Sequence, residues 1–185
     1  MDKNERVELP DPASDPAMYC AALMAVVQNR DPLEIIVQTP AQLRELIRGQ
    51  SDEMLGRRPA PAEWSAIEIA GHLLDDEIVN AFRLRLTLTE NQPSYPGNDP
   101  EGWARLPKPP LAALLQTWEA LRTYNLWLLE SLPRSEWTRV GLHQEQGPES
   151  VEMLILKNAG HDLAHLDQLA RCLSGPSDTR SAVGE

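Results

Sequence analysis

The sequence predicts an all-α protein folded as a four-helix bundle around one hydrophobic core. Long segments place apolar residues at the three- and four-residue spacing of amphipathic helices, and capping residues or prolines bound them. No segment shows a convincing strand pattern, and no repeat recurs at a fixed period. We expect long helices over residues 39–49, 65–89, 111–132 and 150–174, and a short extra helix over 16–29.

The first long helix is expected to begin at Thr39 as the N-cap, with Pro40 at the first helical position, and to end at Gly49. The apolar residues 33–37 either extend this helix backward or pack beside it. The preceding segment, 16–29, is rather apolar for an exposed appendage. It is expected either to cap the core or to meet a second subunit.

The second long helix has a capping box, formed by Ser65 and Glu68, directly after Trp64. No proline interrupts the helical pattern up to about Thr89. Gly71 lies inside this helix, where glycine costs about 1 kcal/mol relative to alanine. We therefore expect another helix or a ligand to approach closely there.

The third long helix is an amphipathic segment that ends at Pro133, and Ser150 is the expected N-cap of the fourth. A long proline-rich loop, residues 91–110, separates the second and third helices. A loop of this length in a compact domain is usually a crossover, functional, or both. Its aromatic residues Tyr95 and Trp103 are candidates for lining a pocket.

Composition and charge exclude several classes of partner. The net charge of −11, without a basic run or stripe, argues against nucleic acid and against an anionic membrane. Two distant cysteines form no disulfide framework, the acidic start lacks a signal peptide's apolar region, and no apolar run could cross a bilayer. We expect a cytoplasmic protein with a mobile arm over 1–15, one domain over 16–175 and a flexible tail over 176–185.

The main chemical signal is the pair His161 and His165, which lie four residues apart and therefore on one face of the last helix. Asn158 and Gln168 share this face, which carries no charge at its centre. Such a pair either fills space in the core or holds a metal ion. The zinc-protease signature H-E-x-x-H does not fit, because Asp162 stands in place of its glutamate.

A third histidine, His72 on the second long helix, favours a metal site, because facing helices of a bundle can bring side chains to one point. Three neutral imidazoles with an open fourth position are the ligand set of a catalytic-type divalent site. Asp76, one turn after His72, is expected to orient an imidazole or to line the pocket.

Other candidates carry weaker signals. His143 lies in an expected loop and is a less favoured additional ligand. We interpret Cys172 as a core thiol, because it lies about two turns beyond His165. Arg83 and Arg85 could meet an acidic cosubstrate, but we interpret them as exposed helix charges.

Two motifs make the chain resemble the DinB/YfiT-like superfamily over about residues 39–173. The motifs are Trp64-Ser65-x-x-Glu68-x-x-x-His72 and His161-Asp162-x-x-His165-x-x-Gln168. The resemblance implies a bundle with up-down-down-up helix order, often a homodimer. It also implies that His72, His161 and His165 bind a divalent metal ion, nickel or zinc. Some characterised relatives are thiol-dependent enzymes, namely mycothiol-dependent maleylpyruvate isomerase and bacillithiol transferases.

Three functions follow as hypotheses, each with a small molecule as the expected substrate or ligand. The first is a transferase that uses a low-molecular-weight thiol as cosubstrate at the metal centre. The second is a hydrolase that activates water at the same centre. The third is a non-catalytic metal-binding or dimerisation module, which a fourth protein ligand such as His143 or a carboxylate would favour.

Overall fold

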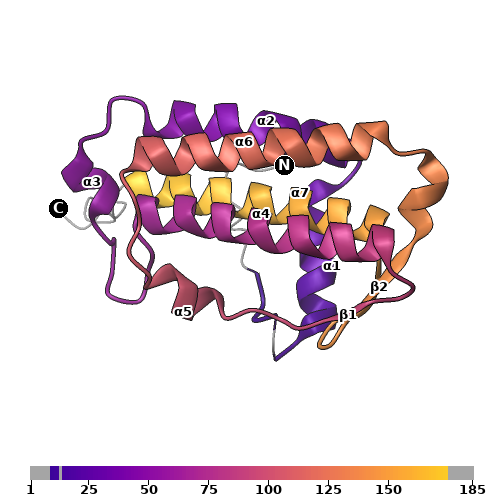
Figure 1. The fold of residues 1–185 in the computed structure, drawn as a ribbon. Helices are drawn as coiled ribbons and strands as arrows, with labels where there is room; N and C mark the ends of the chain where they lie inside the picture. The colour runs from indigo at the N-terminus through magenta and orange to yellow at the C-terminus, as the bar shows by residue number, and fades with distance from the viewer. Residues whose placement is uncertain (1–8, 13, 175–185) are drawn as a thin grey trace.

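Four long helices run side by side and form the bundle that the sequence predicts (Figure 1). The computed structural model describes residues 9–12 and 14–174. Within that part of the chain, no helix is both long and apolar enough to cross a membrane. The long helices are α2 (Pro32–Ile47), α4 (Ala66–Thr89), α6 (Leu111–Ser131) and α7 (Val151–Ser174).

Two apolar clusters fix the directions of these helices. One cluster joins the early parts of α4 and α6 to the late parts of α2 and α7, and the other joins the opposite ends. Helices α4 and α6 are therefore parallel to each other and antiparallel to α2 and α7. The up-down-down-up order is confirmed, and the chain crosses the length of the bundle between α4 and α6. The first cluster includes Leu43, Leu73, Leu114 and Leu169, and the second includes Ile36, Leu84, Leu129 and Ile155.

Helix α2 begins well before the expected start at Thr39. Asp31 is its N-cap and accepts a hydrogen bond from the Leu33 amide at 2.9 Å. Thr39 instead lies inside the helix, where its hydroxyl donates to the Ile35 carbonyl at 2.8 Å. The predicted Thr39 cap is wrong, because a start at Pro32 lets the apolar residues that follow enter the core. Residues 33–37 extend the helix backward, which was one of the two expected arrangements.

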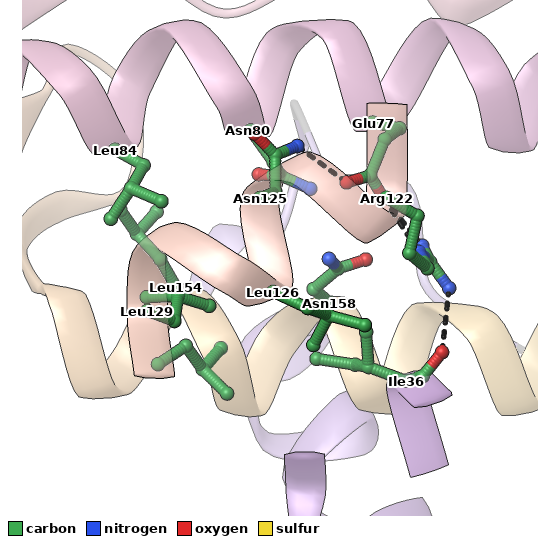
Figure 2. A pocket seen from close by; sticks show the side chains of 11 residues that line it. Ile36, Glu77, Asn80, Leu84, Arg122, Asn125, Leu126, Leu129, Leu154 and Asn158 are labelled. Carbon is green, nitrogen blue, oxygen red and sulfur yellow. Dashed lines mark hydrogen bonds and ion pairs between the residues drawn. The ribbon is translucent and has the colours of Figure 1, made fainter. Parts of the chain in front are cut away.

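Pro40 consequently occupies an interior position of α2. Proline has no N–H to donate to the carbonyl four residues earlier, which here belongs to Ile36. Arg122 of α6 supplies the missing donor, since its Nη1 lies 3.4 Å from the Ile36 oxygen (Figure 2). A side chain from a neighbouring helix thus satisfies the acceptor that the proline leaves free.

A buried charged layer, formed by Glu77, Arg122, Asn125 and Asp162, separates the two apolar clusters. Arg122 donates to Glu77 Oε2 at 2.9 and 2.7 Å and also pairs with both oxygens of Asp162. Asn125 donates to the other Glu77 oxygen at 2.6 Å. Burial raises the pKa of the Asp162 carboxyl to about 6, and the charge of Arg122 opposes that rise. The layer joins α4, α6 and α7 and borders a small cavity of about 30 Å³ (Figure 2).

The other helix starts follow the sequence more closely. Ser65 and Glu68 form the expected capping box of α4, and Arg58 donates to the Glu68 carboxylate. Ser150 Oγ accepts from the Met153 amide at 3.0 Å and so caps α7 as expected. Three short helical turns lie between the long helices: α3 (Asp52–Gly56), α5 (Pro100–Ala104) and η1 (Arg134–Thr138).

A small three-stranded sheet closes one end of the bundle, where the sequence predicted loops and no strand. Its strands are β1 (Ser94–Tyr95), β2 (Val140–His143) and β3 (Gly147–Ser150). Strand β2 pairs in parallel with β1 and antiparallel with β3. Strands of two and four residues are too short for an alternating pattern to emerge in the sequence. His143 therefore lies in a strand and not in a loop.

The short helix α1 (Pro16–Val27) crosses α7 and covers part of the bundle, so it caps the core (Figure 1). Leu23 and Val27 are buried in this contact. Gly160 of α7 permits it, because a Cβ there would lie 2.3 Å from the carbonyl oxygen of Leu23.

Replacing Gly160 with alanine is expected to displace α1 and to lower the free energy of unfolding by about 1–3 kcal/mol. The obstacle is backbone, which cannot rotate away as a side chain can. Gly56→Ala is the matched control, because a Cβ at Gly56 meets no atom within 4 Å. Denaturant unfolding measures both effects, and equal stabilities of the two variants would contradict the close packing of α1 on α7.

Candidate metal centre

Three imidazoles from two helices converge on one point. His72 projects from α4, and His161 and His165 project from successive turns of α7. The Nε2 atom of His161 lies 2.9 Å from that of His72 and 3.1 Å from that of His165. Among the described residues, these three form the group of histidine, cysteine and acidic side chains that could hold a metal ion. The three histidines singled out from the sequence therefore do come together.

Nδ1 of His165 and Nδ1 of His161 each face a side-chain oxygen, which favours a proton on that nitrogen. His165 Nδ1 lies 2.7 Å from the Gln168 amide oxygen, and His161 Nδ1 lies 3.5 Å from a carboxylate oxygen of Asp76. A proton on Nδ1 leaves the Nε2 lone pair free. The lone pairs of these rings thus point toward the shared centre, and their acceptors are the partners that metal-binding imidazoles usually have.

Burial keeps the three imidazoles neutral. It lowers the pKa of His72 and of His161 well below the usual value, and the neighbouring His165 lowers both further. Burial also lowers the pKa of His165, although its contact with Gln168 opposes the change. Neutral imidazoles are the form that binds metal ions. The site therefore needs no proton release from these rings at neutral pH before binding.

The donor set fits a divalent transition-metal ion. Three nitrogens bound tetrahedrally to zinc lie roughly 3.3 Å from one another, close to the Nε2 separations in this site. Imidazole nitrogen suits zinc and nickel, and a three-histidine set leaves one position for an outside ligand. Such an ion supplies Lewis acidity, which lowers the pKa of a thiol or water molecule that binds to it.

The three histidines open onto a cavity with a volume of about 940 Å³. Helices α1, α4 and α7 form much of its wall, and residues 97–101 and His143 contribute from the crossover and the sheet. Residues 9–12, from the segment expected to be a mobile arm, also line it. The rest of that arm, residues 1–8 and 13, and the predicted tail, 176–185, lie outside the described residues.

The predicted pocket residues divide into two groups. Asp76, Asn158 and Gln168 line the same cavity as the three histidines. Tyr95 and Trp103 do not line it; Tyr95 is buried, and the Trp103 carbonyl accepts a hydrogen bond from Lys108 at 3.1 Å. The crossover loop instead contributes residues 97–101.

Trp64 and Arg83 take part in the site in ways that sequence reasoning missed. The Trp64 ring stacks on His165 with centroids 6.2 Å apart and lies beside His72. Arg83 is 8% exposed and lines the cavity, so its interpretation as an exposed charge is wrong. The stripe formed by His72, Asp76 and Arg83 on one helix face could have indicated this.

Three other predicted residues have simple structural environments. Arg85 donates to Asn125 Oδ1 and lies outside the cavity, while Cys172 is a buried core thiol that contacts the Trp64 carbonyl. The close neighbour of Gly71 is the side chain of Lys108, not a helix or a ligand. His143 is buried and is not part of the three-histidine group.

Replacing Asp76 with asparagine is expected to weaken metal binding about 10–100-fold, because its carboxylate faces Nδ1–H of His161. Asp75→Asn is the matched control, since the neighbouring Asp75 pairs with Lys108 at 2.8 Å. Competition with a chelating dye measures the affinities of both variants. Equal losses would show that Asp76 has no particular influence on the histidines.

The fold and the three-histidine cluster agree with a family comparison. The chain belongs to the DinB superfamily, whose family model matches residues 35–169. The bundle also resembles a solved structure described as "YfiT from Bacillus subtilis is a probable metal-dependent hydrolase with an unusual four-helix bundle topology". That match has a TM-score of 0.67 and 21% identity, and it covers 78% of this chain and 86% of the other.

Curated relatives share the same segment. "Putative metal-dependent hydrolase YfiT" of Bacillus subtilis is 26% identical over an alignment of 155 positions, which covers 75% of this chain and 82% of the relative. A protein of Oceanobacillus iheyensis, also named as a metal-dependent hydrolase, is 27% identical over 138 residues, with 74% and 80% coverage. Both relatives carry the name "putative metal-dependent hydrolase".

An exposed aromatic surface on α4 and α6 lies apart from the cavity. Phe82, Tyr124 and Trp127 are more than half exposed, and the Tyr124 and Trp127 rings stack with centroids 6.4 Å apart.

The homodimer and the cytoplasmic location expected from the sequence stay predictions.

Proposed function

We propose that this protein is a metal-dependent transferase that joins a low-molecular-weight thiol to an electrophilic small molecule. The observation that carries the proposal is the convergence of three neutral imidazoles at the wall of a cavity of about 940 Å³. Pockets of about 300–1,000 Å³ accommodate a drug-sized ligand, so this cavity has room for a thiol and a second small molecule together.

The chain's own residues would position the reactants. His72, His161 and His165 would hold nickel or zinc, and Gln168 and Asp76 would orient the rings. In the reaction, a carbon–sulfur bond forms, the bond to the leaving group breaks, and the thiol proton must be accepted. Asp76 lines the cavity, and its carboxylate lies 3.5 Å from Nδ1 of His161, so it would be placed to accept that proton.

Hydrolysis is the second candidate, and Asp76 also favours it. A carboxylate beside a three-histidine centre can accept the proton of a water nucleophile. The relatives named as metal-dependent hydrolases support this candidate as well. The two reactions would use the same residues and differ in the nucleophile.

Turnover assays on protein purified without a histidine tag test the proposal. The zinc- or nickel-loaded protein is incubated with 1-chloro-2,4-dinitrobenzene and with glutathione, mycothiol or bacillithiol in turn. We expect product that requires both the metal and one of the thiols. Thiol-independent cleavage of p-nitrophenyl esters would instead favour the hydrolase. Absence of both reactions would favour a binding or dimerisation module.

A further inference from the structure

One face of α4 forms a polar strip along the cavity. His72, Asp76, Asn80 and Arg83 all line it, at intervals of four, four and three residues. At 1.5 Å per residue, the backbone of Arg83 lies about 16 Å from that of His72 along the helix. The Arg83 guanidinium contacts Tyr95 and Pro96 and therefore lies at the end of the cavity next to strand β1.

Arg83 is a buried cation with no ionic partner among the described residues. Its Nη2 donates to the Pro96 carbonyl at 3.0 Å, and its guanidinium lies 5.3 Å from the centre of the Tyr95 ring. No carboxylate in the described part of the chain forms an ion pair with it. Burial of an unpaired charge is costly, so a charged group that lines a cavity in this way is suited to an ionic ligand.

His143 presents a second donor to the same end of the cavity. Its Nδ1 accepts hydrogen bonds from the amides of Glu145 and Gln146 at 3.1 and 3.2 Å. These two donors place the ring proton on Nε2, which is not hydrogen-bonded to any described residue. The His143 ring packs edge-on against the Tyr95 ring, and the Arg83 guanidinium lies over the same Tyr95 ring. Both donors therefore contact Tyr95.

Other charged groups of the cavity interior already have partners. Lys157 pairs with the buried Glu149. Asp76 accepts from Asn80 at 2.7 Å and faces His161. The remaining acids of the cavity wall, among them Asp99, Glu101 and Glu145, are exposed. Arg83 is therefore the interior charge that remains available to a ligand.

We propose that Arg83 and His143 bind a carboxylate of the substrate or cosubstrate, at the opposite end of the cavity from the three histidines. The planar guanidinium suits a carboxylate, which can accept two hydrogen bonds from it. The inference that the other end of this molecule reaches the metal rests on the proposed function. The helix geometry then gives a spacing on the order of 10 Å between carboxylate and reacting group.

Calorimetry with octanoate and octanamide tests the carboxylate subsite in metal-free protein. We expect octanoate to bind at least tenfold more tightly than octanamide, and Arg83→Gln to reduce this ratio to less than about twofold. Arg85→Gln is the matched control and retains the ratio, because Arg85 lies on the same helix outside the cavity. Equal binding of the two probes to the wild type, or no binding, overturns the proposal.

A second variant tests the subsite independently, in case Arg83→Gln does not fold. In His143→Asn, the asparagine oxygen can still accept from the turn amides, while the Nε2–H donor is lost. We expect this variant to keep the wild-type circular dichroism spectrum and to weaken octanoate binding several-fold. Unchanged octanoate affinity in this variant would show that His143 does not bind the carboxylate.

The link to the metal end has its own readout. With cobalt-substituted protein, 8-mercaptooctanoate should bind more tightly than 8-mercaptooctanamide, as followed by the thiolate-to-cobalt absorption band. Thiol binding without a preference for the carboxylate overturns the subsite and leaves the transferase proposal intact. Octanoate selectivity without any thiol-dependent turnover leaves the subsite intact and contradicts the proposed function.

Discussion

Replacing Arg122 with methionine is expected to lower the free energy of unfolding by about 3–5 kcal/mol. Methionine keeps most of the side-chain length but leaves Glu77 and Asp162 as buried carboxylates without their shared cation. It also leaves the Ile36 carbonyl without a donor, because Pro40 cannot provide one. Chemical denaturation followed by circular dichroism measures the loss.

Arg44→Met is the matched control for this variant. Arg44 also belongs to an ion pair that joins two long helices, but its side chain is 51% exposed and its partner, Glu119, is 30% exposed. Such a pair contributes less than about 1 kcal/mol. Adding Glu77→Gln and Asp162→Asn to Arg122→Met should recover part of the stability, since neutral amides tolerate burial better. If Arg122→Met and Arg44→Met cost the same, the buried layer does not hold the bundle together.

Replacing His72 with alanine is expected to reduce the affinity for zinc or nickel by more than about 100-fold, so that the variant is purified without its metal. Two ligands from α7 remain, and the link to α4 is lost. Elemental analysis of protein purified without a histidine tag gives the metal content. His143→Ala is the control for metal content, since His143 is not part of the ligand group.

Two results of this experiment would contradict a centre formed by these three histidines alone. The first is unchanged metal content in His72→Ala, because the site would then not include α4. The second is an equal loss in His143→Ala, because His143 would then be a further ligand or the metal would bind elsewhere. Apo protein that folds normally is expected in both variants, since the apolar clusters involve neither histidine.

The sequence predicted the bundle and the histidine centre because both depend on local spacing. Capping at Ser65 and Ser150 and the four-residue interval between His161 and His165 are visible without tertiary structure. The meeting of His72 with the other two depends on how α4 faces α7. That step came from the family resemblance as much as from the general geometry of bundles.

The sequence did not predict the buried charged layer, because the apolar spacing along α6 suggests a different buried face. Along α6 the buried positions pass through Trp118, Arg122 and Asn125, whereas the apolar pattern in the sequence continues through Leu121. Which face of α6 is buried depends on residues far away in the sequence. The two carboxylates that pair with Arg122 come from other helices. The burial of Arg83 was missed for the same reason, since Tyr95 and Pro96 reach it from the crossover.

The start of α2 shows a different limit. Thr39-Pro40 is a favourable helix start in isolation, and an interior proline is normally disfavoured. The penalty is reduced here because Arg122 supplies the donor that Pro40 lacks. Only the folded bundle contains that donor, so local rules alone selected the wrong N-cap.

Because α1 forms part of the cavity wall, a ligand in the cavity is expected to influence how firmly α1 packs on the bundle. Tyr19 and Leu23 of this helix line the same cavity as the three histidines, and its contact with α7 is through Gly160. A molecule that fills the cavity and contacts α1 stabilises the packing of α1 on α7. The gain equals the binding free energy that those contacts contribute. Protease resistance around residues 16–27 would then report saturation of the interior, even for compounds that never react.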